Sequence, residues 1–324
     1  MMTVLNLGTR GSALALAQTE WVLQQLDAAG VAARVVAVQA DGDAYSALRA
    51  ALVAGQVDVA VHSYKDLPIG ADPRVVVAAV PQRADPRDAL VARDGMVLGE
   101  LPPGATVGTG SARRGSQLRA LGLGLHVVPI RGNVDSRIRR VVDGECDAVV
   151  IAAAGLARLG RLNEATELLD PLQMLPAPGQ GALACECRVN DLDTEHLLGS
   201  LLDDAPSRAA VTAERALLAA VGGDCGAAVG ALADVVEDLD DDGRVVLRLY
   251  LRGVAATTDD DLVRSSAIAP YSGASLSCGP HSFGKLTDAE NVGRQVAAEL
   301  LDLAGGALGD WVVSPAPRRP GPSA

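Results

Sequence analysis

The sequence predicts an α/β protein built from two similar lobes with a cleft between them, followed by a small α+β domain. Short β-branched runs alternate with Ala- and Leu-rich stretches over residues 3–61 and again over 106–152, as in strand–helix units around a mostly parallel sheet. Proline-containing segments at 81–88 and 176–181 indicate two crossings between these series. Two strands within 228–254, flanked by helical stretches, indicate the third domain.

The first series belongs to lobe 1, which we place at residues 1–81 and 182–203. A strand is expected at 3–7, followed by a helix that extends to residue 28 and has Ser12 as its N-cap. The other expected elements of this lobe are a strand at 31–38, a helix at 45–54, a buried strand at 57–61 and a returning strand at 182–188.

Lobe 2, placed at residues 87–175, repeats the alternation of strands and helices. Its expected elements are a strand at 106–107, a helix ending near 121, a strand at 126–130, a helix at 134–142 and a strand at 147–152.

The third domain, placed at residues 205–304, has a different pattern. We expect a helix at 207–221 that begins with Ser207, and a hairpin of strands 228–236 and 245–254. Thr287 and Glu290 form a capping box that predicts the start of a last helix, ending near 303. The proline-rich tail, 314–324, is expected to be disordered.

Composition argues against several classes of protein. The 324 residues include 28 basic and 40 acidic ones, a net charge of −12, and 49% are hydrophobic, which argues against disorder. No apolar stretch is long enough to span a bilayer, and no secretory signal is visible. Aromatic residues make up only 2%, which argues against nucleic-acid modules that stack bases.

The cysteines predict neither disulfides nor a metal site. Five cysteines, an odd number in a chain of this length, do not form a disulfide framework, so we expect reduced thiols and a cytoplasmic protein. Cys185 and Cys187 alternate along an expected strand with no second pair of Cys or His nearby. Nothing in the sequence demands more than a monomer.

Arginines gather in the first half of lobe 2. Residues 111–140 contain seven arginines and one acid, Asp135, a local charge of +6. Arg113 and Arg114 fall in the first turn of a helix and Arg131 at a strand-to-helix junction, where anion binding is the better interpretation. For the remaining members we favour a solvated helix face: Arg119, Arg139 and Arg140. Arg10 repeats the junction in lobe 1, which alone is weak evidence.

Two further segments could carry chemistry. In the loop 62–68, Asp66 is a candidate general base or an ionised carboxylate that stabilises a cation, although composition alone favours a turn-forming Asp. His62 alone is more often structural than catalytic. Cys225 lies in a glycine-rich loop and could be a nucleophile or an attachment point, or equally a small packed residue.

In order along nearly the whole chain, these segments resemble the porphobilinogen deaminase (hydroxymethylbilane synthase) family. The matching motifs are residues 8–12 (GTRGS), 59–68 (VAVHSYKDLP), 85–89 (DPRDA), 107–114, 131–137, 154–160 (AGLARLG), 180–182 (QGA), 211–216 (VTAERA) and the Cys225 loop. The resemblance implies two lobes like those of periplasmic binding proteins and a small α+β domain. It also implies an enzyme that joins four porphobilinogen molecules, releasing ammonia, to give hydroxymethylbilane for tetrapyrrole and haem synthesis.

The resemblance also implies roles for individual residues. A dipyrromethane cofactor would be held through a thioether to Cys225, with further cofactor contacts from Ser63, Ser111, Arg113, Arg114 and Arg131. Asp66 would stabilise the cation left when ammonia departs, assisted by Lys65 and Arg10. The residues expected to bind substrate carboxylates are Arg10, Ser12, Arg131, Arg137 and Arg158. A growing chain of acetates and propionates needs such an arginine-lined cleft.

Three departures from the family pattern affect this expectation. After residues 41–43 the family inserts a longer glycine-rich lid over the active site, which is missing here. Asp224 replaces a glycine before the cofactor cysteine, where a carboxylate disfavours the thiolate, and Gly110 replaces a hydroxyl residue. The runner-up is therefore a non-catalytic or specialised pyrrole- or tetrapyrrole-binding paralogue. A two-lobed binder of small anions leaves Cys225 unexplained, and nucleic-acid binding is least favoured.

Overall fold

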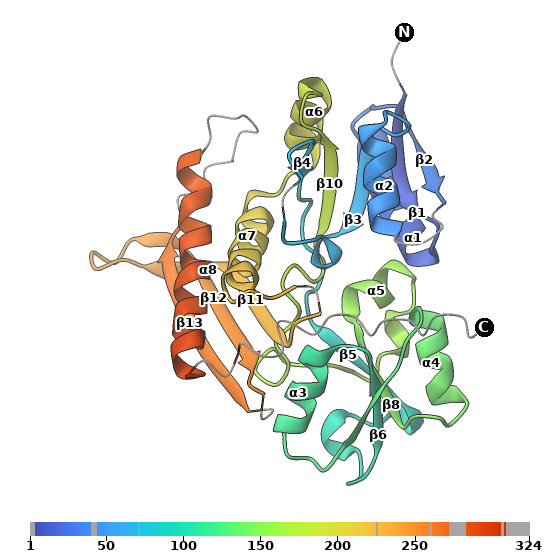
Figure 1. The fold of residues 1–324 in the computed structure, drawn as a ribbon, viewed down its shortest axis with the longest axis vertical. Coiled ribbons are helices and arrows are strands. Elements are labelled where there is room, and N and C mark those ends of the chain that lie inside the picture. Colours follow the sequence, from blue (N-terminus) through green and yellow to red (C-terminus); the bar gives the residue numbers. More distant parts are fainter. Residues whose placement is uncertain are drawn as a thin grey trace, which may run out of the picture.

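The computed structural model describes residues 4–39, 44–70, 72–224, 226–258, 261–271, 283–305 and 308. The strands among these residues form three sheets, two with five strands and one with three. Figure 1 shows the first two sheets in separate lobes, one above the other, and the third beside them with two long helices. The predicted α/β architecture of two lobes and a small α+β domain is confirmed. Among the described residues, no helix is long and apolar enough to cross a membrane.

Lobe 1 contains a mixed sheet with the strand order β2-β1-β3-β10-β4. Its strands are β1 (Leu5–Arg10), β2 (Ala33–Val38), β3 (Val59–Ser63), β4 (Val75–Ala79) and β10 (Leu183–Arg188). Its helices are α1 (Ala13–Ala28), α2 (Ala44–Val53) and α6 (Leu192–Leu202). Apolar clusters fill both faces, one including Val22 and Leu198, the other Leu48 and Leu52. The first strand therefore lies a few residues beyond the predicted 3–7, whereas Ser12 caps α1 as predicted.

Lobe 2 has a sheet of the same kind, in the order β7-β6-β8-β5-β9. Its strands are β5 (Asp88–Ala92), β6 (Thr106–Thr109), β7 (His126–Pro129), β8 (Ala148–Ala152) and β9 (Glu167–Leu168). Its helices are α3 (Ala112–Ala120), α4 (Val134–Val142) and α5 (Ala153–Arg158). The helix predicted at 134–142 is confirmed at both ends.

In each lobe, one strand runs against the others. This strand is β5 in lobe 2 and β10 in lobe 1, and each directly follows a crossing from the other lobe. The remaining strands run the same way, so the carboxyl ends of β1, β3, β6 and β8 lie at one edge of their sheets. That edge is where open α/β sheets bind ligands. The topology thus directs both sets of strand ends toward the region between the lobes (Figure 1).

The third domain is a three-stranded antiparallel sheet covered on one face by two helices. The strands are β11 (Val229–Leu239), β12 (Val245–Ala256) and β13 (Leu262–Pro270), and the helices are α7 (Ala205–Ala220) and α8 (Phe283–Leu303). The predicted hairpin is β11 and β12, but β13 was not predicted. Two predicted helix starts are wrong. Asp204, not Ser207, caps α7 by accepting from the Ser207 N–H, and α8 begins at Phe283 rather than at Thr287.

Candidate functional site

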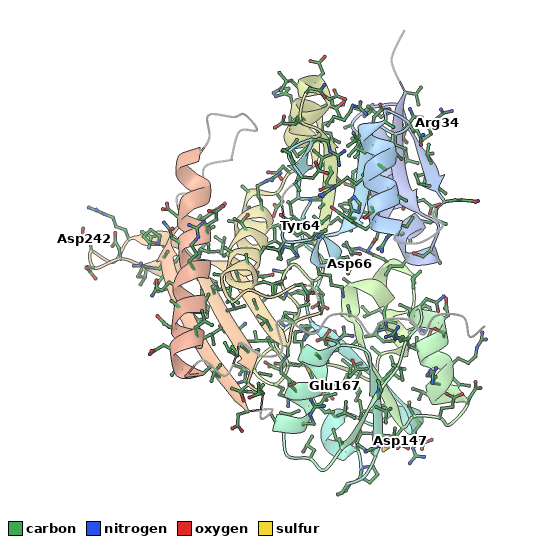
Figure 2. The ribbon with its side chains drawn as sticks, in the orientation of Figure 1. Arg34, Tyr64, Asp66, Asp147, Glu167 and Asp242 are labelled. Carbon is green, nitrogen blue, oxygen red and sulfur yellow. The ribbon has the colours of Figure 1, made fainter. Side chains whose placement is uncertain are left out.

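A cavity of about 390 Å³ lies between the lobes, a size typical of small-molecule sites. Residues at the end of β1 and the start of α1, the turn after β3, the start of α4 and the β8–α5 junction line it. The predicted site residues among them are Arg10, Ser12, Lys65, Asp66, Arg114 and Arg137. Asp66 lies where the two lobes meet (Figure 2). The structure thus brings together six side chains that are far apart in the sequence.

Arg10 and Asp66 form an ion pair at this cavity, with 3.3 Å between Nη2 and Oδ2. Their side chains are 30% and 44% exposed, so both remain accessible to a ligand. Asp66 ends a short 3₁₀ turn, Tyr64–Asp66, that follows β3 directly. A second carboxylate at the cavity, Asp135, is paired with Arg161. Asp66 is therefore the carboxylate whose arginine partner, Arg10, itself lines the cavity.

Lys65 lies next to Asp66 but contacts an amide rather than a carboxylate. Its Nζ donates to Oε1 of Gln180, 3.1 Å away, in the second crossing between the lobes. Burial, followed by the nearby charge of Arg114, lowers the pKa of Lys65 to about 8. Lys65 thus changes its charge close to neutral pH, as groups at functional sites often do.

Arg113 and Arg114 both bind Asp88, the first residue of β5. Nη2 of Arg113 lies 2.8 Å from Oδ2 of Asp88, and Nη2 of Arg114 lies 2.7 Å from Oδ1. Burial alone would raise the pKa of Asp88, but the charges of the two arginines outweigh it and hold the pKa well below its usual range. Gln180 completes the group by donating to Asp88 at 2.8 Å. The anion held at this helix start is therefore a carboxylate of the protein itself.

Arg137 lies at the cavity with no carboxylate partner among the described residues. Its Nε donates to the carbonyl oxygen of Gly132 at 2.9 Å, and burial, followed by the charge of Arg114, lowers its pKa. Its neighbour Arg131 is exposed and does not line the cavity. A half-buried guanidinium with no carboxylate partner in the described part of the chain is suited to a carboxylate that arrives with a ligand.

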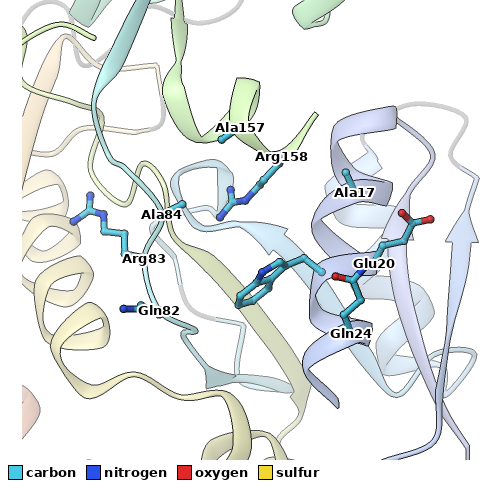
Figure 3. A pocket seen from close by; sticks show the side chains of 9 residues that line it. Ala17, Glu20, Gln24, Gln82, Arg83, Ala84, Ala157 and Arg158 are labelled. Carbon is cyan, nitrogen blue, oxygen red and sulfur yellow. The ribbon is translucent and has the colours of Figure 1, made fainter. Parts of the chain in front are cut away.

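Arg158 lies in a second cavity, of about 510 Å³, between α1, α5 and the first crossing (Figure 3). Its Nη2 donates to the carbonyl oxygen of Gly181 at 2.7 Å, and burial lowers its pKa to about 10. Ala157, its neighbour, lines the same cavity, whereas Gly155 and Leu159 line the first. The structure therefore places Arg158 apart from the other predicted substrate-binding residues, on an adjacent part of α5.

The predicted serines have structural partners. The hydroxyl of Ser63 is buried and hydrogen-bonded to Gln18, and that of Ser111 caps α3 by accepting from the Arg114 N–H at 3.4 Å. Neither lines the cavity between the lobes. Next to Ser111, a Cβ on Gly110 would lie 2.5 Å from the carbonyl oxygen of Ile130, so close packing favours glycine there.

Cys225 lies outside the described residues, as does the tail 314–324. Its neighbour Asp224 is described, and Oδ1 of this residue accepts a hydrogen bond from the Gly226 N–H at 2.8 Å. No group of three or more His, Cys, Asp or Glu side chains suited to a metal ion occurs within the described ranges.

His62 belongs to β3 rather than to a loop, and this corrects the sequence analysis. It is buried beneath α2, where its Nε2 lies 3.3 Å from a carboxylate oxygen of Glu186 and its ring packs on Tyr45. A structural role is the interpretation favoured for His62 from the sequence, and this buried environment agrees with it. Gln180 and Asp88, by contrast, link the two lobes at the site but had no recognised role; their positions at the crossings were the only signal.

Taken together, the cavity presents four cationic side chains and two carboxylates, Asp66 paired with Arg10 of the cavity and Asp135 paired with Arg161. Two arginines near it, Arg137 and Arg158, have no carboxylate partner among the described residues. This arrangement fits a ligand that carries several carboxylates and develops a positive charge near Asp66.

The chain is similar to known proteins over most of its length. Residues 5–196 match the family model for the porphobilinogen deaminase dipyromethane cofactor binding domain, and residues 208–302 match the model for its C-terminal domain. Porphobilinogen deaminase from Nocardia farcinica is 55% identical over 93% of this chain and 86% of its own length, and that from Mycobacterium tuberculosis is 53% identical over 93% and 96%. A periplasmic substrate-binding protein of an ABC transporter from Coxiella burnetii is similar with a TM-score of 0.41 and 15% identity, over 61% of this chain and 92% of that one. The chain belongs to the porphobilinogen deaminase family.

Proposed function

We propose that this chain joins four porphobilinogen molecules head to tail, with release of ammonia, to give hydroxymethylbilane for tetrapyrrole synthesis. It is a transferase that uses a dipyrromethane cofactor. The observation that carries the proposal is the pair of Arg10 and Asp66 at a cavity whose Arg137 has no carboxylate partner among the residues that the structure describes. Membership of the family supports the substrate and the cofactor.

The charges at the cavity suit this substrate. Porphobilinogen carries an acetate and a propionate. Arg137 and Arg114, the second already bonded to Asp88, present guanidinium groups from lobe 2, and Arg10 and Ser12 supply donors from lobe 1. When ammonia leaves porphobilinogen, positive charge develops on the pyrrole. The carboxylate of Asp66 is positioned to stabilise that charge, because its only paired partner among the described residues is the accessible Arg10. Lys65 in its charged form adds a fourth cation for the carboxylates.

The cofactor site is proposed on the same grounds. Dipyrromethane, when bound, supplies the pyrrole ring to which the first substrate is joined. Cys225 would hold it through a thioether, with contacts from Ser63, Ser111, Arg113, Arg114 and Arg131. Because Asp88 engages both Arg113 and Arg114, a cofactor carboxylate would share those guanidinium groups with it.

We also propose that the missing lid leaves the mouth of the cavity open. Helix α2 begins at Ala44, only one residue after the Asp-Gly-Asp motif at 41–43. The match with the Nocardia protein runs over 315 positions yet includes 93% of these 324 residues, so that relative has residues in the matched stretch that this chain lacks. An open mouth admits water, and we expect turnover to be slower than in relatives that keep a lid.

Intact mass under denaturing conditions tests the function, with Cys225→Ser as the matched control. We expect the unaltered chain to carry two linked pyrrole units and the variant to carry none, and the purified chain to release ammonia from porphobilinogen. An unmodified mass, even after incubation with porphobilinogen or preformed hydroxymethylbilane, would instead favour the pyrrole- or tetrapyrrole-binding paralogue. Retention of pyrroles without ammonia release would favour it as well.

We further propose that the chain acts as a monomer in the cytoplasm. Cys146 and Cys185 are buried free thiols, which agrees with a reducing compartment. Sedimentation equilibrium tests the first part: a mass that stays at the monomer value across a wide range of concentration is expected, and a concentration-dependent increase would contradict it.

A further inference from the structure

Helix α7 of the third domain contacts the turn that carries Lys65 and Asp66. From this helix, Nη2 of Arg215 donates to the carbonyl oxygens of Leu67 and Pro68, each at 2.7 Å. The same guanidinium lies 5.9 Å from the ring centroid of Tyr64. One side chain therefore contacts the residue before Lys65 and the two residues after Asp66.

The second crossing between the lobes supports the turn from another direction. The Tyr64 N–H donates to the carbonyl oxygen of Ala182 at 3.0 Å. Gly179 has a φ of +79°, and a Cβ there would lie 3.2 Å from Cδ1 of Tyr64 and 3.3 Å from the backbone nitrogen of Lys65. The crossing thus fixes the start of the turn, and Arg215 fixes its end.

The residue before Arg215 anchors α7 to both crossings. The buried carboxylate of Glu214 accepts from Arg83 of the first crossing at 2.6 and 3.0 Å and from the Gly179 N–H of the second at 2.6 Å. It also accepts from the Ala233 N–H of β11 at 2.8 Å. Because three parts of the chain meet at Glu214, the backbone from which Arg215 extends is itself held in place.

We propose that Arg215 is a positioning residue that sets where Asp66 lies relative to Arg10 and to the arginines of lobe 2. The inference rests on the proposed function of the cavity. The side chain of Asp66 is paired only with Arg10 among the described residues, so its location depends on the backbone of the turn. A displaced carboxylate stabilises a developing cation less well, whereas Arg114 and Arg137 bind substrate carboxylates from another lobe. Loss of Arg215 should therefore lower kcat more than it changes KM.

The test compares three variants. Arg215→Ala removes the contacts with the turn, Arg215→Lys keeps a charged donor of similar reach, and Arg208→Ala is the matched control. Arg208 lies on the same helix and also donates to carbonyl oxygens of lobe 1, but to those of Val77 and Ala78 in β4 rather than to those of the turn. We expect Arg215→Ala to lower kcat by about 10- to 100-fold with KM changed less than about threefold. Arg215→Lys should recover most of kcat, and Arg208→Ala should keep it.

Hydrogen exchange at Leu67 provides a second, direct measurement. Its N–H closes the turn by donating to the carbonyl oxygen of Tyr64 at 3.1 Å. We expect faster exchange in Arg215→Ala and no change in Arg208→Ala. If Arg215→Ala does not fold, Arg215→Gln takes its place in both measurements. Unchanged kcat and exchange, or equal losses in the Arg208 variant, would overturn the inference. If the unaltered chain shows no turnover, the proposed function fails, and the exchange measurement still decides whether Arg215 holds the turn.

Discussion

Lys65 and Gln180 meet where the two lobes join, with 3.1 Å between the ammonium nitrogen and the amide oxygen. The amide nitrogen of Gln180 in turn donates to Asp88 at 2.8 Å. The neutral side chain of Gln180 therefore lies between the ammonium group of Lys65 and the buried carboxylate of Asp88 in lobe 2. Because Lys65 is desolvated without a carboxylate in direct contact, its charged form is less stable than in water, and its pKa falls to about 8.

The lowered pKa of Lys65 predicts that activity decreases at alkaline pH. If the charged form of Lys65 helps to bind substrate carboxylates, kcat/KM should decrease above about pH 8 as the ammonium loses its proton. Lys65→Arg keeps a charge throughout this range, so its limb should move to higher pH. Profiles of kcat/KM against pH for both proteins provide the check. A limb at the same pH in the variant would assign it to another group.

The same group links stability to pH. The pKa of Lys65 is about 8 in the folded chain and has its ordinary value of 10.5 in the unfolded chain, so between these values the unfolded chain binds more protons. The contribution of Lys65 to the free energy of unfolding should therefore increase as pH rises from 8 to 10.5 and be lost as pH falls back. Urea unfolding of the unaltered chain and of Lys65→Met at several pH values measures this difference. A difference that stays constant would contradict the lowered pKa.

Asp66→Asn tests the proposed role of the carboxylate. The amide has nearly the same shape but no charge, so it cannot stabilise a developing cation, and turnover should fall by about 100-fold or more. Attachment of pyrrole units at Cys225, read by intact mass, need not be lost. Asp135→Asn is the control, because Asp135 also lines the cavity and is also paired with an arginine, Arg161, but lies on α4 of the other lobe. Equal losses in the two variants would show that general charge, not the position of Asp66, is what matters.

Local patterns in the sequence predicted the two lobes well, because proline and glycine mark the crossings and apolar alternation marks the strands. Strand β13 was not predicted because Arg264, Ser265 and Ser266 interrupt its apolar residues. Only its pairing with β12 explains why it forms. Strand β5 was not predicted for a related reason. It starts with Asp88, a charge that a buried strand rarely begins with, and the partners that neutralise it lie 25 and 26 residues further along the chain.

At the site, the partners of the arginines could not be predicted from local sequence patterns either. Arg113 and Arg114 were predicted to bind an anion from their place at a helix start, and they do contact a carboxylate. No pattern in the sequence indicates that this carboxylate belongs to the protein, because the contact depends on how β5 packs beside α3. Arg158 was grouped with the other substrate-binding residues by motif, yet the direction of its side chain from α5 places it in a neighbouring cavity.

Asp88 should contribute more to stability than any exposed ion pair. Asp88→Asn leaves the buried guanidinium groups of Arg113 and Arg114 without their counter-charge, which costs about 3–5 kcal/mol. The control is Asp85→Asn, three residues earlier, whose pair with Arg87 is partly exposed and worth less than about 1 kcal/mol. Urea unfolding at neutral pH measures both losses.

The free energy of unfolding at acidic pH provides a second measurement on the same pair of variants. The pKa of Asp88 is held below its usual range in the folded chain, so its stabilisation is complete above the ordinary pKa of an aspartate and is lost only as pH falls through the lowered value. The difference in unfolding free energy between the unaltered chain and Asp88→Asn should therefore shrink as the solution is acidified below about pH 4. If Asp88→Asn unfolds no more easily than Asp85→Asn, Asp88 is not the counter-charge that holds Arg113 and Arg114 in place.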